Sequence, residues 1–135
     1  MLYLFGSGSY KGNRKVVKVG FTDDIETRKQ QYLLHNPLGE FLGIRDGDRL
    51  LELKLHLRLE DYKVEFLDEW FYDEEEVEEI FGSTEFQLNK WLWENRNTTL
   101  LNPEMPKQGT MKYEIYEELK SMFDCTGLDF GQKSL

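Results

Sequence analysis

Hydrophobic and polar positions alternate in short runs through the first part of the chain. Residues 2–5, Leu-Tyr-Leu-Phe, form an apolar run that ends at Gly6, and residues 15–21 are rich in β-branched side chains. Both runs are typical of β-strands, and the glycine-, serine- and asparagine-rich residues 6–14 between them are typical of a loop. The pattern therefore predicts a β-hairpin with a long connection.

A helix and a third strand are expected after the hairpin. Asp23 and Glu26 have the spacing of a capping box, which predicts a helix that begins there. Pro37 stops that helix at about His35, because the residue before a proline disfavours helical backbone. Residues 40–45 then have the composition of a short strand.

Residues 50–60 allow two interpretations. Leucine alternates with polar residues over 51–59, which is the period of a strand, but the segment has no β-branched or aromatic side chain. Leucine, glutamate, lysine and arginine favour helices. On a helix, Glu52 and His56 lie on one polar stripe between two leucine ridges. We therefore predict a helix, with Asp48 as its N-cap and Glu52 facing a cleft.

The second half of the chain is expected to be mainly helical. Residues 68–72 have the composition of a short aromatic strand or extended segment, and helices are expected over 74–81, capped by Asp73, over about 85–94 and over 110–123. The last two helices are rich in apolar side chains, which should be buried on the first domain or on a second copy of the chain, as a homodimer. These side chains are Phe86, Trp91, Trp93, Met111, Ile115, Leu119 and Met122.

The charge is distributed unevenly along the 135 residues. The net charge is −9, but residues 1–50 hold 8 Lys or Arg against 6 Asp or Glu, whereas residues 51–135 hold 9 against 20. The net charge speaks against a nucleic-acid partner, but the acidic residues are concentrated in the second half, so the first half could still bind phosphate. Eight basic residues predict weak nonspecific affinity unless a metal or a partner contributes.

Several classes of function are disfavoured by composition. A single cysteine allows no internal disulfide and favours a reducing, cytoplasmic location, which includes delivery into a host cell. No apolar run reaches the roughly 20 residues that a membrane helix needs. Two histidines and one cysteine make a zinc cluster improbable. The glycines of residues 6–12 match no phosphate-binding motif.

One ordered set of residues resembles a known family. Tyr3 lies in the first expected strand, Lys18-Val19-Gly20 ends the second, and Arg28 lies just over one turn inside the first helix. Glu52-x-x-x-His56 and Glu69-Trp70-Phe71 follow. The order resembles the GIY-YIG nuclease superfamily, especially its compact branch in phage proteins, over roughly residues 1–81.

The resemblance implies a fold and a domain boundary. The superfamily has a three-stranded antiparallel sheet flanked by helices, which agrees with the order of strands and helices expected from the pattern alone. The chain is accordingly expected to be an α/β (α+β) protein, with a nuclease-like domain at 1–82 and a helical extension at 83–135.

The resemblance also implies roles for individual residues. Tyr3 would help to activate the attacking water, Arg28 would neutralise the scissile phosphate, and Glu52 would ligate Mg²⁺ or Mn²⁺. Such chemistry needs a base, a fixed cation and a metal that stabilises the leaving oxygen. Lys18 is expected to assist catalysis as a cation near the phosphate. His56 is expected to support Glu52 without binding the metal. Two further lysines, Lys15 and Lys29, are expected to join Lys18 and Arg28 in binding nucleic acid.

Two departures from the family leave alternatives open. Lys18 replaces the tyrosine of the second motif, so a phenol is lost and a cation is gained. The later asparagine of the family has no clear match, and Asn89 is a guess. The leading expectation is a magnesium-dependent endonuclease that hydrolyses a nucleic-acid phosphodiester, with DNA as the expected substrate and RNA left open. The alternatives are a catalytically silent nucleic-acid-binding module and an acidic protein-binding adaptor.

Overall fold

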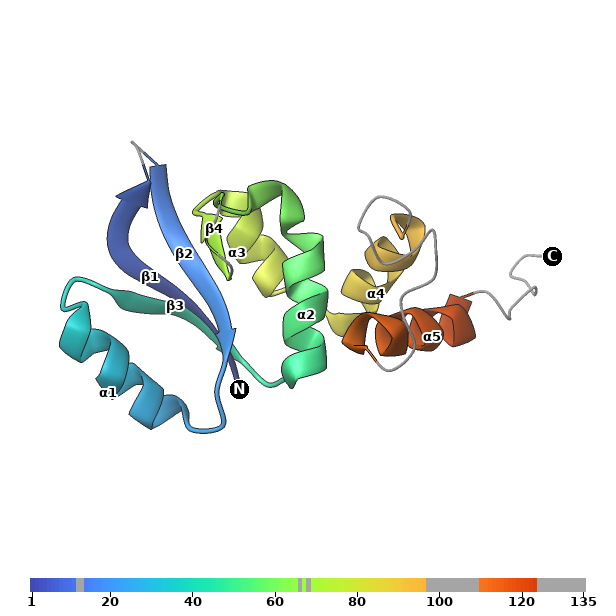
Figure 1. Cartoon of the computed structure of the whole chain (residues 1–135), viewed down its shortest axis with the longest axis horizontal. Coiled ribbons are helices and arrows are strands. Elements are labelled where there is room, and N and C mark those ends of the chain that lie inside the picture. The colour runs from blue at the N-terminus through green and yellow to red at the C-terminus, as the bar shows by residue number, and fades with distance from the viewer. Residues whose placement is uncertain (12–13, 66, 68, 97–109, 124–135) are drawn as a thin grey trace. The chain divides into compact units, whose positions relative to one another are not determined.

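The chain has an α+β fold. The computed structural model describes residues 1–11, 14–65, 67, 69–96 and 110–123, and within them it has four strands, five α-helices and one short 3-10 helix (Figure 1). The chain divides into two compact units, Met1–Ser83 and Thr84–Leu135. In the described residues, every helix is too short or too polar to cross a bilayer.

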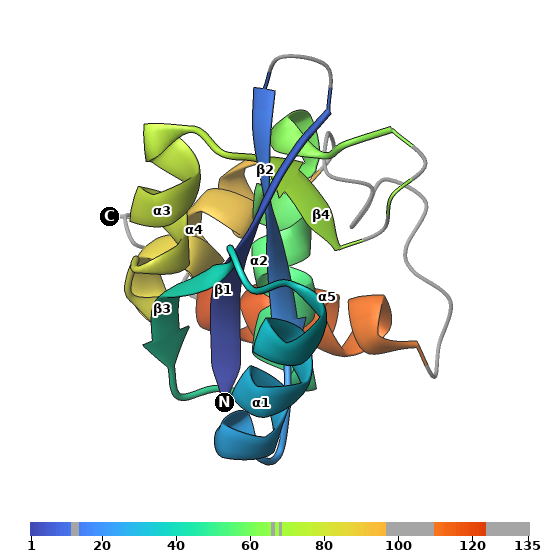
Figure 2. The ribbon, with the colours of Figure 1, turned by 90° about the vertical axis from the view of Figure 1, so that its left-hand side faces the viewer.

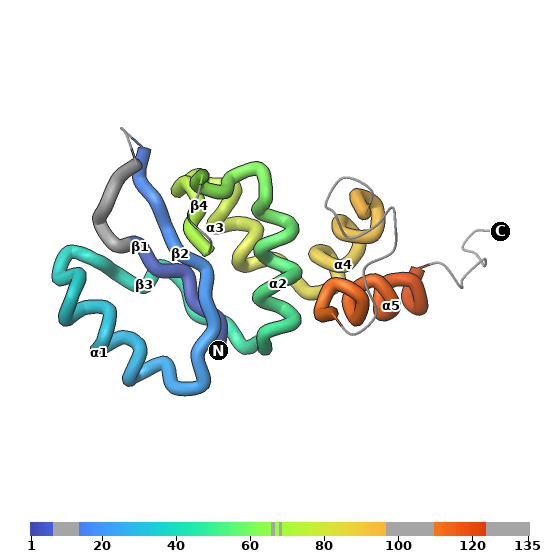
Figure 3. The backbone as a smooth tube through the Cα atoms, viewed as in Figure 1, coloured from blue at the N-terminus to red at the C-terminus, as the bar shows by residue number. Residues whose placement is uncertain are grey.

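The sheet of the first unit is antiparallel and has the strand order β3-β1-β2-β4 (Figure 3). Its strands are β1 (Leu2–Lys11), β2 (Arg14–Phe21), β3 (Glu40–Arg45) and β4 (Trp70–Tyr72). The expectation of three strands is wrong by one, because the aromatic segment after residue 69 pairs with Val16, Val17 and Lys18 of β2 as an edge strand.

The connection between β1 and β2 is shorter than the sequence predicts. The two strands are paired as far as Lys11 and Arg14, so residues 6–14 do not form the expected loop. The register shifts between Gly6 and Tyr10, which marks a bulge within the strand pair. Glycine is common at bulges because it has no side chain to place, so the glycine-rich composition here belongs to an irregular strand.

The two helices nearest the sheet have aspartate N-caps. Helix α1 (Ile25–His35) is capped by Asp24, whose carboxylate accepts a 3.1 Å hydrogen bond from the backbone N–H of Thr27. The expected cap, Asp23, is therefore wrong by one residue. Helix α2 (Arg49–Arg58) is capped by Asp48, as predicted.

The helical prediction for residues 50–60 is confirmed over most of its length. Helix α2 ends at Arg58, and a 3-10 turn, Glu60–Tyr62, follows it. The next helix, α3 (Glu75–Phe81), has Glu74 at its N-cap. The cap expected at Asp73 is wrong, because the N–H of Asp73 donates to the carbonyl of Lys15 on β2 and so extends the strand pairing.

Helices cover both faces of the sheet. Helix α1 lies on one face and α2 on the other (Figures 1 and 2), with α3 packed beside α2. Side chains alternate along β1, so Tyr3 and Phe5 meet Tyr32 of α1, whereas Leu2 and Leu4 point into the core beneath α2 and α3. All four strand residues are almost fully buried.

The second unit contains a pair of packed helices, α4 (Glu85–Glu94) and α5 (Met111–Phe123). A capping box of Thr84 and Gln87 begins α4. Expected burial is confirmed for Ile115 and Leu119 and wrong for Phe86, which is 61% exposed. Other members of the expected set, Trp91, Trp93 and Met111, are partly buried, and Met122 is 40% exposed. The homodimer stays a prediction.

Candidate active site

The site begins with the packing of Tyr3 against β2. Tyr3 lies opposite Gly20 in the β1–β2 register, and a Cβ atom on residue 20 would lie 2.5 Å from the Cζ atom of Tyr3. The glycine therefore leaves room for the tyrosine ring. Tyr3 is only 1% exposed, and its hydroxyl points towards α1, where it meets a second phenol.

That second phenol is Tyr32, which the sequence analysis missed. Tyr32 lies one helical turn after Arg28, so both side chains project from the same face of α1. The hydroxyl oxygens of Tyr3 and Tyr32 are 2.8 Å apart, and the rings meet edge to face with centroids 5.7 Å apart. The available signal in the sequence was the spacing of four residues between Arg28 and Tyr32, which places both on one face of the helix.

Two cations complete what we call the tyrosine–cation cluster, made of Tyr3, Lys18, Arg28 and Tyr32. The Nζ atom of Lys18 donates a 2.8 Å hydrogen bond to the hydroxyl of Tyr32. Arg28 donates to the hydroxyls of Tyr3, at 3.3 Å, and Tyr32, at 3.5 Å. Three residues expected at the site are thus joined through direct contacts, with Tyr32 at their centre.

The two phenols differ in their acidity. Burial, followed by the hydrogen bond with Tyr32, raises the pKa of Tyr3 well above the ordinary tyrosine value. Burial also acts to raise the pKa of Tyr32, but hydrogen bonds from Lys18, Tyr3 and Arg28 outweigh it and lower the pKa of Tyr32 below that value. Tyr32 is therefore the phenol of the pair that ionises first.

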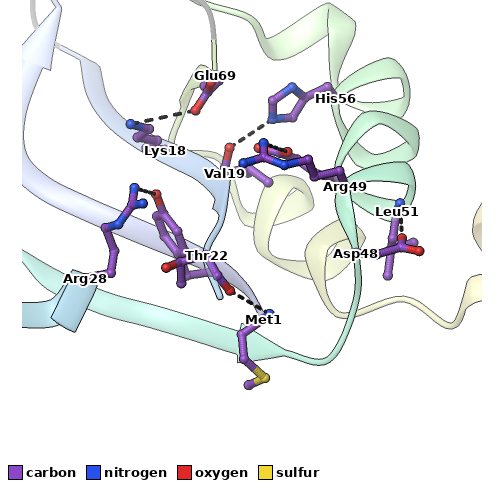
Figure 4. Close-up of polar contacts among 12 residues, drawn as sticks. Met1, Lys18, Val19, Thr22, Arg28, Asp48, Arg49, Leu51, His56 and Glu69 are labelled. Atoms are coloured by element: carbon purple, nitrogen blue, oxygen red, sulfur yellow. Dashed lines mark hydrogen bonds and ion pairs between the residues drawn. The ribbon is translucent and has the colours of Figure 1, made fainter. Parts of the chain in front are cut away.

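Helix α2 brings a carboxylate towards β2 from the other side. Figure 4 shows Arg28 on one side of β2 and His56 and Arg49 of α2 on the other. The side chain of Glu52 is 13% exposed and lies 4.0 Å from Arg49. Burial raises the pKa of Glu52, and the nearby charge of Glu69 acts in the same direction.

Glu52 is linked to the tyrosine–cation cluster by charge. His56, Arg49 and Lys18, in that order, act to lower the pKa of Glu52 and so favour its ionised form. His56 itself is 2.9 Å from the carbonyl oxygen of Val19, the residue that follows Lys18. A carbonyl can only accept, so Nε2 of His56 donates there and orients the ring (Figure 4).

The donor set suits a hard divalent cation. In the described part of the chain, no group of three or more His, Cys, Asp or Glu side chains could hold a metal ion. Mg²⁺, however, commonly binds through one or two carboxylates and keeps several waters. Glu52, a carboxylate largely withdrawn from solvent and repelled by Glu69, fits that requirement.

The remaining expected residues lie outside the cluster. Lys15 and Lys18 differ by three positions on β2, so their side chains project from opposite faces of the sheet. The charge of Lys15 acts instead on Glu78, where it opposes the rise of the Glu78 pKa that burial causes. Lys29 is the partly exposed neighbour of Arg28 and pairs with Glu26 at 3.9 Å. Asn89 lies on α4 in the second unit, where its amide contacts Met122.

Comparison with known proteins identifies one family. No curated protein and no solved structure matches the chain. The model of one family, the T5orf172 domain, matches residues 1–85, a stretch that holds the whole sheet, helices α1 to α3 and the tyrosine–cation cluster. The chain therefore belongs to the T5orf172 domain family, a phage-associated family related to GIY-YIG and nuclease-like folds.

Proposed function

We propose that the first unit is a GIY-YIG-type endonuclease that hydrolyses a nucleic-acid phosphodiester, with DNA as the favoured substrate and Mg²⁺ or Mn²⁺ as its metal. One observation carries the proposal. The hydroxyl of Tyr32 receives hydrogen bonds from Lys18 at 2.8 Å and from Arg28 at 3.5 Å, beside a second phenol. A phenol under two cations can act as a base, and the same cations can bind a phosphate.

Arg28 and Lys18 supply the positive charge that a phosphodiester needs. Arg28 presents a planar fork of donors, which suits two phosphate oxygens, and Lys18 acts as a point charge. Both already donate to phenolic oxygens, so their charged groups lie at the site before the substrate arrives. Fixed cations stabilise the charge that grows on the phosphate in the transition state.

Tyr32 is the residue that we expect to accept the proton of the attacking water. The water oxygen forms a bond to phosphorus, its proton passes to the ionised oxygen of Tyr32, and the bond to the leaving oxygen breaks. Tyr3 stabilises the ionised phenol through the 2.8 Å hydrogen bond. The family resemblance gave the first role to Tyr3, but burial and the raised pKa of Tyr3 favour Tyr32.

Glu52 would hold the metal. Mg²⁺, when bound, stabilises negative charge on the leaving oxygen. Glu52 is mostly buried, and burial raises its pKa, so a cation that binds there relieves an unfavourable charge. His56 would support Glu52 without binding the metal itself through Nε2, because this nitrogen is already bonded to the carbonyl of Val19.

The test is a cleavage assay on supercoiled plasmid, linear DNA, branched DNA and RNA, each with and without Mg²⁺ or Mn²⁺. Metal-dependent cleavage by the wild type and its loss in Glu52→Gln are expected. Glu60→Gln is a matched control, because it removes a carboxylate that is exposed just beyond α2. Cleavage at the same rate by wild type and Glu52→Gln would overturn the mechanism.

Two alternatives predict other outcomes of the same assay. A catalytically silent module binds nucleic acid, with no effect of metal and no cleavage. An acidic adaptor binds a basic protein instead, and an open pocket lined by acidic side chains gives that alternative a specific basis. These side chains are Asp73, Glu75, Glu78 and Glu79, all at or near α3.

A further inference from the structure

Glu69 has an unusual backbone conformation. Among the described residues it is the one non-glycine residue with a positive φ, at 70°. Glycine or asparagine adopts this region more readily, so a glutamate there is strained. The conformation sits directly before β4, and the carbonyl of Glu69 accepts a 3.0 Å hydrogen bond from the N–H of Val19. Strained residues of this kind gather at functional sites.

The side chain of Glu69 reaches the cluster through Lys18. Its Oε1 atom lies 3.7 Å from the Nζ atom of Lys18 (Figure 4). The same Nζ atom donates to Tyr32 at 2.8 Å. The ammonium is thus held between a carboxylate and a phenol. A lysine has a flexible four-carbon stem, so a single contact with Tyr32 would not fix its position.

The contact is a poor explanation of stability. The Glu69 side chain is 45% exposed, and exposed ion pairs contribute little to the free energy of unfolding. Glu69 also repels the carboxylate of Glu52 and raises the pKa of Glu52. A strained residue with a weak attraction on one side and a repulsion on the other needs a reason beyond folding.

We propose that Glu69 is a positioning residue that anchors the ammonium of Lys18 against the hydroxyl of Tyr32. The inference rests on the proposed function, because it gives Lys18 a fixed place in the nuclease site. The negative charge of Glu69 also repels an incoming phosphate. Loss of the charge in Glu69→Gln should therefore leave nucleic-acid affinity equal or higher while turnover falls.

The deciding experiment follows the ionisation of Tyr32 in the full-length protein without metal or nucleic acid. Tyrosine labelled with ¹³C at Cζ gives a separate signal for each ring, and Tyr32→Phe identifies the signal of Tyr32. Glu69→Gln should shift the pKa of Tyr32 upwards, because Lys18 leaves the phenol. If Glu69 merely offset the charge of Lys18, its removal would shift that pKa downwards, and a downward shift or no shift would overturn the proposal.

Three further variants keep the outcome clear. Glu69→Gly removes the strain together with the carboxylate, so it should fold well and still raise the pKa of Tyr32. Glu69→Asp should restore part of the wild-type value. Glu65→Gln, which removes an exposed carboxylate from the same connection, should change nothing.

The titration separates this proposal from the proposed function. An upward shift in Glu69→Gln together with a wild type that cuts no substrate would remove the nuclease and leave the positioning contact intact. Cleavage by the wild type, with no upward shift of the Tyr32 pKa in Glu69→Gln, would support the nuclease and overturn the positioning role of Glu69.

Discussion

Gly20 faces Tyr3 across the β1–β2 pair, so closely that a Cβ atom on residue 20 would lie 2.5 Å from the Cζ atom of the tyrosine. No positive φ requires this glycine. Its role is to let the ring of Tyr3 lie against β2, which places the Tyr3 hydroxyl 2.8 Å from Tyr32. The glycine of the second motif therefore supports the site through packing.

Gly20→Ala should displace Tyr3 and weaken the fold. Overpacking of a buried site typically costs about 1–3 kcal/mol, and the loss should appear in urea unfolding. Gly82→Ala is the matched control, because a Cβ atom at residue 82 meets only ordinary contacts of 3.7 Å and longer. Equal stability of the two variants would contradict the close approach of Tyr3 and Gly20.

Tyr32→Phe should abolish most cleavage and leave nucleic-acid binding nearly unchanged. General-base catalysis contributes about 10²–10⁴-fold, and the variant loses a single hydroxyl. In the wild type the rate should rise with pH and level off below the ordinary pKa of tyrosine, because the base acts when ionised and its pKa is lowered. Tyr113→Phe in α5 is the control, and equal rates for both variants would exclude Tyr32 as the base.

Glu52→Gln should be more stable than the wild type at neutral pH without metal. Burial raises the pKa of Glu52, so Glu52 stabilises the folded state when protonated, and that contribution is lost as pH rises through the folded-state pKa. The difference between the variants should therefore vanish in acid. Mg²⁺ should raise the melting temperature of the wild type alone; a similar rise in Glu52→Gln would exclude Glu52 as the ligand.

Asp24→Ala should destabilise α1 and with it the position of Arg28. The carboxylate of Asp24 accepts hydrogen bonds from the backbone and the hydroxyl of Thr27, which lower the pKa of Asp24. A lowered pKa contributes stability that is present at neutral pH and lost as pH falls through the folded-state pKa. The melting temperature of Asp24→Ala should approach that of the wild type in acid, whereas Asp23→Ala should match the wild type throughout.

Local chemistry made much of the fold predictable. Asp48 satisfies the backbone N–H of Leu51, and the leucine-rich residues that follow form α2 despite their period of two. The same reasoning failed at residues 6–14, because a strand pair with a bulge and a flexible loop have similar composition. The aromatic composition of residues 68–72 indicated a strand or extended segment, but its pairing with residues 16–18 as a fourth strand of the sheet is a long-range contact that no local pattern contains.

The candidate site was predictable in part for a related reason. Tyr3, Lys18 and Arg28 could be named from their order in the chain. Their common partner Tyr32 was missed, because its spacing of four residues from Arg28 shows only that the two share a helix face and not that both meet Tyr3. The contact between Glu69 and Lys18 comes from a residue with a backbone φ of 70°, and a sequence of ordinary residues gives no sign of either feature.

Arg28→Ala should lower nucleic-acid affinity and turnover together, because the guanidinium meets the ground-state phosphate as well as the transition state. Loss of one phosphate contact should reduce the slope of log affinity against log salt by about 1. The variant should also raise the pKa of Tyr32, which loses a hydrogen bond from Arg28, so any remaining cleavage should need a higher pH.

Lys29→Ala is the matched control, since Lys29 is the next residue on α1 and pairs with Glu26 outside the cluster. It should change affinity slightly and leave the pH dependence of cleavage unchanged. A silent binding module would behave differently: Arg28→Ala would weaken binding, and no cleavage would exist at any pH. Arg28 donates to both phenols and Lys29 pairs with Glu26, so the two variants should differ. Equal effects of Arg28→Ala and Lys29→Ala on binding, salt dependence and the Tyr32 titration would show that Arg28 is one more surface cation.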